Sequence, residues 1–242
     1  MSRRWIIALV VVVAVALAAV LSAVRVTTAS GHGSPPTYLV TVTNLTDGQP
    51  MTPPVVAIHR RPVDLFDIGR QASFELKEIA ENGNIAPMLA RLDPANNRHV
   101  ADVQSSAPEP IVLEGSPGEA TFATAQAFVL TGGRGANYLS IASMLICTND
   151  GFTGVDSLRL PGKVGESTTV FTAGYDAGTE MNTEDFADIV PPCQGLIGVS
   201  SADDGTGMSN AALAENGVIG LHPGIAGGAD LLPDVHGWVD PV

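Results

Sequence analysis

"STTVFTAGYDAGTE", residues 167–180, is the stretch of sequence that decides the fold. Its first part is rich in Thr, Val and Phe, residue types that favour extended strands. Its last part places carboxylates at Asp176 and Glu180, with only Ala177, Gly178 and Thr179 between them. Two like charges on so short a loop repel each other unless a cation lies between them. The stretch therefore predicts a β-strand that opens into an acidic, cation-binding loop.

The charge of the chain is distributed unevenly. The 12 Lys and Arg residues and 25 Asp and Glu residues give a formal net charge of −13, and Lys163 is the last basic residue. Twelve carboxylates follow Lys163 before the chain ends. Such a surface repels nucleic acid and attracts cations. Charge alone favours a plainer interpretation, in which this is a solvated acidic face that aids solubility.

The first thirty residues predict an export segment that lies outside the fold. Arg3 and Arg4 precede the apolar run Trp5–Val24, which contains no charged residue. This arrangement is typical of a cleavable signal peptide, but a run of about 20 residues also suffices for an uncleaved membrane anchor. We therefore expect a secreted, periplasmic or cell-surface protein that contacts a membrane only through this segment, if it is retained. Residues 31–36 read as a linker and residues 37–242 as one domain.

Short strands separated by turns dominate the rest of the chain. Ser73 is a suitable N-cap and Asn82-Gly83 a suitable stop, which predicts a helix over residues 73–83 and leaves open a second one over 86–91. The strands are expected at residues 37–45, 52–59, 118–130, 138–150, 167–180 and 217–224. Many strands with one or two short helices indicate an all-β fold, an antiparallel β-sandwich.

Cys147 and Cys193 are the only cysteines in the chain. In an exported protein, two lone cysteines are expected to pair, because the compartment is oxidising. A Cys147–Cys193 disulfide would connect the segment "TNDGF" to the segment that follows the acidic loop.

The sequence contains no familiar catalytic motif. The five histidines lack the spacing of a zinc site, and G-x-S-x-G, P-loop and G-x-G-x-x-G patterns are missing. Paired carboxylates could serve a glycosidase, but that chemistry needs a sugar cleft and one acid kept protonated. Oxygen ligands alone suit a hard cation such as calcium.

Two motifs stand out: "CTNDGFTGVDSL", residues 147–158, and "YDAGTE", residues 175–180. Together they resemble the spondin domain, the N-terminal module of F-spondin and mindin, in its bacterial secreted branch. The resemblance implies an antiparallel β-sandwich that binds one calcium ion through Asp150, Asp176 and Glu180. The animal members have Asp at the position of Glu180, so its longer arm changes the ligand geometry. Asp156 is expected to be a structural or outer-shell residue.

The resemblance also implies a function. We expect a non-catalytic, calcium-binding module for adhesion or cell-surface interaction, with an unknown protein or glycan partner and no nucleic acid. The alternative is a calcium-dependent secreted hydrolase that acts on carbohydrate or lipid. A cleft holding a nucleophile–base pair, or two carboxylates of divergent pKa, would favour the enzyme.

Overall fold

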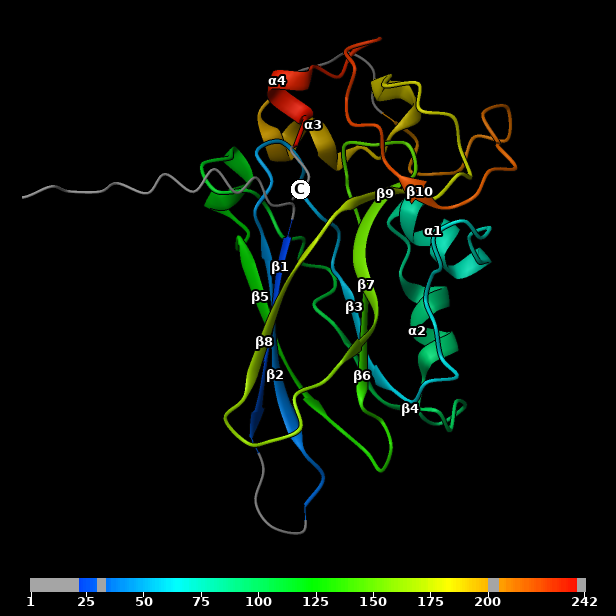
Figure 1. Cartoon of the computed structure of the whole chain (residues 1–242). Helices are drawn as coiled ribbons and strands as arrows, with labels where there is room; N and C mark the ends of the chain where they lie inside the picture. The colour runs from blue at the N-terminus through cyan, green and yellow to red at the C-terminus, as the bar shows by residue number, and fades with distance from the viewer. Residues whose placement is uncertain (1–21, 30–33, 200–204, 239–242) are drawn as a thin grey trace, which may run out of the picture.

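The computed structural model describes residues 22–29, 34–199 and 205–238, which form a pair of antiparallel sheets that face each other (Figure 1). The four-stranded sheet has the order β5 (Ala125–Thr131), β2 (Thr37–Asn44), β1 (Ser22–Ala29), β8 (Ser167–Thr172). The six-stranded sheet has the order β10 (Gly220–Leu221), β9 (Gly174–Asp176), β7 (Gly151–Arg159), β6 (Tyr138–Met144), β3 (Val55–His59), β4 (Val100–Ser105). The predicted all-β, antiparallel sandwich is confirmed.

Four short α-helices accompany the sheets in the described part of the chain. Helix α1, Phe74–Asn82, begins at Ser73, whose hydroxyl accepts the amide of Leu76, and ends at Gly83 in the left-handed conformation. The helix predicted over residues 73–83 is confirmed, and the second helix that the sequence left open is present as α2, Ala86–Leu92. The other two were not expected: α3 covers Pro192–Ile197 and α4 covers Pro233–His236. Each is shorter than two turns and lacks an apolar period that could reveal it.

The apolar side chains form two layers of core. One layer fills the space between the sheets and contains Val40 and Ile58. The other lies between the six-stranded sheet and helices α1 and α2, and contains Ala57 and Leu76. Strand β3 contributes to both layers, which explains why all five of its residues are buried. The helices cover the face of this sheet that points away from the four-stranded sheet (Figure 1).

Strand β1 corrects the expected start of the domain. It occupies Ser22–Ala29, pairs with β2 and β8, and lies inside the four-stranded sheet. Val24 and Val26 are each 1% exposed and belong to the core between the sheets. The prediction that the first thirty residues contribute nothing to the fold is therefore wrong for this segment. The error arose because Val24 extends the preceding apolar run without a break.

Most of the other predictions for the N-terminal segment concern residues that the structure does not describe. The apolar run up to residue 21, residue 30, and residues 31–33 of the expected linker lie outside the described residues. Among the helices that the structure does describe, none has the length and apolarity needed to cross a bilayer.

The connections place the two sequence motifs at one end of the sandwich. Strand β7 begins at Gly151, directly after "CTND", and its first residues pair with β9, which ends at Asp176. Helices α3 and α4 lie at this same end (Figure 1). The strand pairing therefore brings the two acidic segments together across the sheet.

Candidate metal centre

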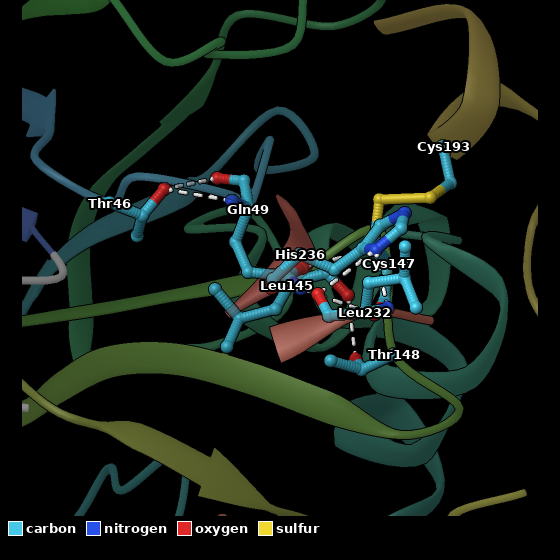
Figure 2. Close-up of a disulfide and its surroundings, with 8 residues drawn as sticks. All are labelled: Thr46, Gln49, Leu145, Cys147, Thr148, Cys193, Leu232 and His236. Carbon is cyan, nitrogen blue, oxygen red and sulfur yellow. Dashed lines mark hydrogen bonds between the residues drawn. A yellow bond between two sulfur atoms is a disulfide. The ribbon is translucent and has the colours of Figure 1, made fainter. Parts of the chain in front are cut away.

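A disulfide fixes the segment on which the centre is built. Cys147 and Cys193 are bonded, with their Cα atoms 5.2 Å apart, which confirms the predicted pairing. Gln49 holds Cys147 from the other side, because its amide accepts from Cys147 N at 3.0 Å and donates to Cys147 O at 3.2 Å (Figure 2). The same amide nitrogen donates to the carbonyl of His236 at 2.6 Å. Gln49, which follows β2, thus links the start of the motif to His236 of helix α4.

Asp150 lies at the centre of the acidic loops and is 0% exposed. Its Oδ2 atom accepts hydrogen bonds from Thr179 N at 2.7 Å, Thr179 Oγ1 at 3.2 Å and Glu180 N at 3.1 Å. Its Oδ1 atom is buried without a hydrogen-bond partner among the described residues. An orphaned carboxylate oxygen in a buried position is costly unless a cation or water satisfies it.

Asp176 and Glu180 are each held by their own hydrogen bonds. Asp176 accepts from Gly178 N through Oδ1 and from Asn182 Nδ2 through Oδ2, both at 2.7 Å. Glu180 is 3% exposed, and its Oε1 atom accepts from Asn210 N at 2.8 Å. Neither side chain forms an ion pair with a basic residue among the residues that the structure describes.

The electrostatics of the centre disfavour its negative charges. Burial, followed by the charge of Asp176, raises the pKa of Asp150 to about 6, against the hydrogen bonds from Thr179 and Glu180 that lower it. Burial is also the largest cause that raises the pKa of Glu180 to about 7, followed by the charges of Glu81, Asp150 and Asp188. The pKa values of Asp150 and Glu180 are both raised, so these carboxyls do not form the pair of divergent pKa that a general acid and a nucleophile need.

The three predicted ligands do not form one compact group. Asp150 interacts electrostatically with both Asp176 and Glu180, and is the member common to the two pairs. Within the described residues, no set of three His, Cys, Asp or Glu side chains converges closely enough to hold a metal ion. The structure thus fits a cation best at Asp150 Oδ1, while the ligand set as a whole stays a prediction.

Two further residues organise the acidic loop and were not singled out from the sequence. Asn149 Oδ1 accepts from Thr183 N at 3.1 Å, while the neighbouring Asp150 accepts from Thr179 N. The two adjacent side chains of the first motif therefore hold two parts of the acidic loop. Glu184 has φ 60° and accepts from Ala226 N and Gly228 N, both at 2.6 Å. Its role depends on contacts more than 40 residues away, which no local pattern reveals.

Asp156, from the same motif, has a structural role, as expected. Its Oδ1 atom accepts from Leu65 N at 2.6 Å and from Ser140 Oγ at 3.0 Å. Ser140 Oγ also lies 2.7 Å from His59 Nε2, which places a serine beside a histidine. However, Ser140 and His59 are both 0% exposed, so this network offers no hydroxyl to a substrate. It lends no support to the hydrolase alternative.

A disulfide-braced antiparallel β-sandwich with acidic loops at one end is the class of protein that this fold and site define. The sequence matches the Spondin_N family model over residues 49–187, which is more than half of the 242-residue chain. The chain therefore belongs to the spondin domain family. No curated protein matches it. Family membership and the disulfide together indicate an extracellular or secreted protein.

Proposed function

We propose that the chain is an exported, non-catalytic interaction module that binds calcium through Asp150, Asp176 and Glu180. The observation that carries the proposal is the buried Oδ1 atom of Asp150, which has no hydrogen-bond partner among the described residues and lies in the field of a second carboxylate. A divalent cation would satisfy this oxygen and neutralise the repulsion at once.

The donor set suits calcium among the biological cations. All three side chains offer carboxylate oxygens, the ligands that hard cations prefer, and no His or free Cys accompanies them within the described residues. Asp150 would be the central ligand because its Oδ2 atom is already saturated by three donors and leaves Oδ1 for the ion. Main-chain carbonyls and water would supply the rest of the six to eight oxygens that calcium takes.

Calcium would act in this module as a structural clamp. Asp150 belongs to the segment before β7, whereas Asp176 and Glu180 belong to the segment after β8. An ion shared by these carboxylates would hold the two segments in one arrangement and present the loops of this end of the sandwich as a rigid surface. Spondin domain membership supports an extracellular interaction role for such a surface.

Isothermal titration of the full-length protein with calcium tests the proposal. Wild type is expected to bind, Asp150→Asn to lose binding, and Asp234→Asn to retain it. Asp234 is a matched control because it is an exposed carboxylate on α4. Equal calcium affinity in wild type and Asp150→Asn would show that the acidic loops are only a solvated surface.

A further inference from the structure

Four strands of the six-stranded sheet reach the end opposite the acidic loops in one row. Val100 of β4 pairs with His59 of β3, His59 pairs with Tyr138 of β6, and Tyr138 pairs with Arg159 of β7. Adjacent strands lie about 4.8 Å apart, so this row is about 14 Å wide. Arginines lie in the row or within four residues of it along the chain: Arg60, Arg61, Arg98, Arg134 and Arg159. We call this group the basic end.

The guanidinium groups of the basic end are available to a partner. All five arginines are exposed, and within the described residues none of them forms an ion pair. Arg98 donates a hydrogen bond from Nε to His99 Nε2 at 3.2 Å, which leaves its terminal nitrogens to face solvent.

Three carboxylates lie within four residues of these arginines along the chain, and each is held by another group. Asp64 faces Arg91 at 4.0 Å, Asp102 accepts from Thr131 N, and Asp156 accepts from Leu65 N. They offset part of the positive charge, and five arginines against three carboxylates leave an excess of positive charge at the basic end.

Such a concentration of positive charge is unusual on a chain whose net charge is −13. Five arginines against three carboxylates leave an excess of positive charge at this end, and like charges repel one another unless an anion lies among them. This excess indicates that the basic end meets an anionic partner.

We propose that the basic end binds an anionic polysaccharide through its carboxylate or sulfate groups. Arginine suits this task because its planar guanidinium forms paired hydrogen bonds with such groups. The arginines are spread along a row of strand ends, which matches anions repeated along a polymer better than one isolated anion. The site is separate from the proposed calcium ligands and does not depend on them.

A cavity at the basic end favours carbohydrate over other polyanions. It has a volume of about 480 Å³, within the range of ligand sites, and Tyr38, Asn137 and Arg159 supply polar groups to a lining that also contains apolar residues such as Leu160 and Val164. Phenol, amide and guanidinium groups together suit the hydroxyls and carboxylate of an acidic sugar. Tyr138, the aromatic residue of the row, is stacked on His59 with ring centroids 6.3 Å apart and is only partly exposed. It offers little surface for the base stacking that single-stranded nucleic acid uses.

Binding of the full-length protein to three immobilised polysaccharides tests the proposal: heparin as a sulfated chain, polygalacturonate as a carboxylated chain, and dextran as an uncharged one. The variant Arg60→Gln/Arg98→Gln removes two charges from the basic end. The matched control Arg25→Gln/Arg70→Gln removes two exposed charges from elsewhere. We expect the first variant to bind at least one anionic chain about tenfold more weakly than wild type, with the control within about twofold. Melting temperatures of both variants confirm that they are folded.

Four results would overturn the proposal. The first is binding to dextran as tight as binding to the anionic chains, and the second is an equal loss of polysaccharide affinity in both double variants. The third is tighter binding to duplex DNA or to phosphatidylserine vesicles than to either anionic polysaccharide. The fourth is a change in molar mass by light scattering without polysaccharide binding. The last result would identify a second copy of the chain as the partner. Polysaccharide binding that survives in Asp150→Asn separates this inference from the calcium proposal, so either can fail alone.

Discussion

Asp150 Oδ2 accepts the main-chain N–H of Thr179 at 2.7 Å, across 29 residues of sequence. Two more donors, the Thr179 hydroxyl and the amide of Glu180, point at the same oxygen. One oxygen of this buried carboxylate is therefore saturated, while Oδ1 has no partner among the described residues. This asymmetry separates a structural role of Asp150, carried by Oδ2, from a ligand role carried by Oδ1.

The substitution Asp150→Asn is expected to separate the two roles. The amide oxygen keeps the bonds from Thr179 and Glu180, and the loss of charge removes the repulsion from Asp176. Without calcium, the variant should therefore melt at or above the wild-type temperature. With calcium, wild type should gain stability and the variant should not. Calorimetric melting with and without calcium checks both, with Asp234→Asn as control. A variant that is destabilised without calcium and still responds to calcium would contradict the ligand role.

Stability without calcium is expected to fall as the pH rises. The pKa of Asp150 is raised in the fold from 3.8 to about 6, so the unfolded chain loses its proton first and the folded state retains it. The contribution is thus fully present below the unfolded pKa and is lost as the pH rises through about 6. Urea unfolding from pH 4 to 7.5 checks this, with the difference between wild type and Asp150→Asn isolating the one group. If wild type instead became more stable relative to Asp150→Asn as the pH rises, the expectation would be contradicted.

Removal of the disulfide is expected to destabilise the whole domain. The bond spans 46 residues, and the chain-entropy model assigns a loop of this length about 4 kcal/mol of stabilisation. The double variant Cys147→Ser/Cys193→Ser should therefore lose about this free energy of unfolding in urea. Wild type treated with reductant should show a similar loss. If the double variant matches oxidised wild type, the bridge does not brace the fold.

Much of the fold could be predicted because local signals agreed with it. The alternation in residues 37–45 and the caps Ser73 and Gly83 correspond to β2 and α1 within a residue or two. Strands β4 and β7 were not predicted, because Val100–Ser105 is short and half polar, and because the strand expected over residues 138–150 ends just before Gly151–Arg159. Residues 118–124 were expected to begin a strand, but a 3₁₀ helix at Pro117–Ala120 precedes β5.

The candidate site was only partially predictable. The motif residues Asp150, Asp176 and Glu180 lie at one end of the sandwich, as the sequence indicated. Their distribution around Asp150 depends on the pairing of β7 with β9 and on Asn210, which is 30 residues from Glu180. The basic end was not recognised, because its five arginines are spread over about a hundred residues and only the strand register gathers them.

Strand β1 gives a test of where the domain begins. Val24 is 1% exposed between the sheets, so Val24→Ala should lower the free energy of unfolding by about 2 kcal/mol. The neighbouring Arg25 points outward and is exposed, so Arg25→Ala should change it by less than about 0.5 kcal/mol. A chain that starts at Ser34 lacks β1 altogether and should not fold cooperatively. Urea unfolding distinguishes these cases, and normal stability of the shortened chain would remove β1 from the domain.

The acidic loop requires a glycine at position 178, between its two carboxylates. The φ of Gly178 is +67°, and a Cβ atom there would lie 2.7 Å from the main-chain nitrogen of Val218. Gly178 also donates its amide to Asp176 Oδ1, so a displaced backbone would move a proposed ligand. Gly178→Ala should therefore weaken calcium binding as well as stability.

Gly69 provides the matched control for this substitution. Its φ is +82°, but nothing lies within 4 Å of a Cβ atom built there. Gly69→Ala thus carries only the cost of the left-handed conformation, about 1–2 kcal/mol, whereas Gly178→Ala adds the close contact with Val218. Urea unfolding should show a clearly larger loss for Gly178→Ala, and calcium titration should show weaker binding for that variant alone. If both variants lose the same stability and bind calcium equally, the close approach of Val218 does not shape the loop, and Asp176 is not positioned through Gly178.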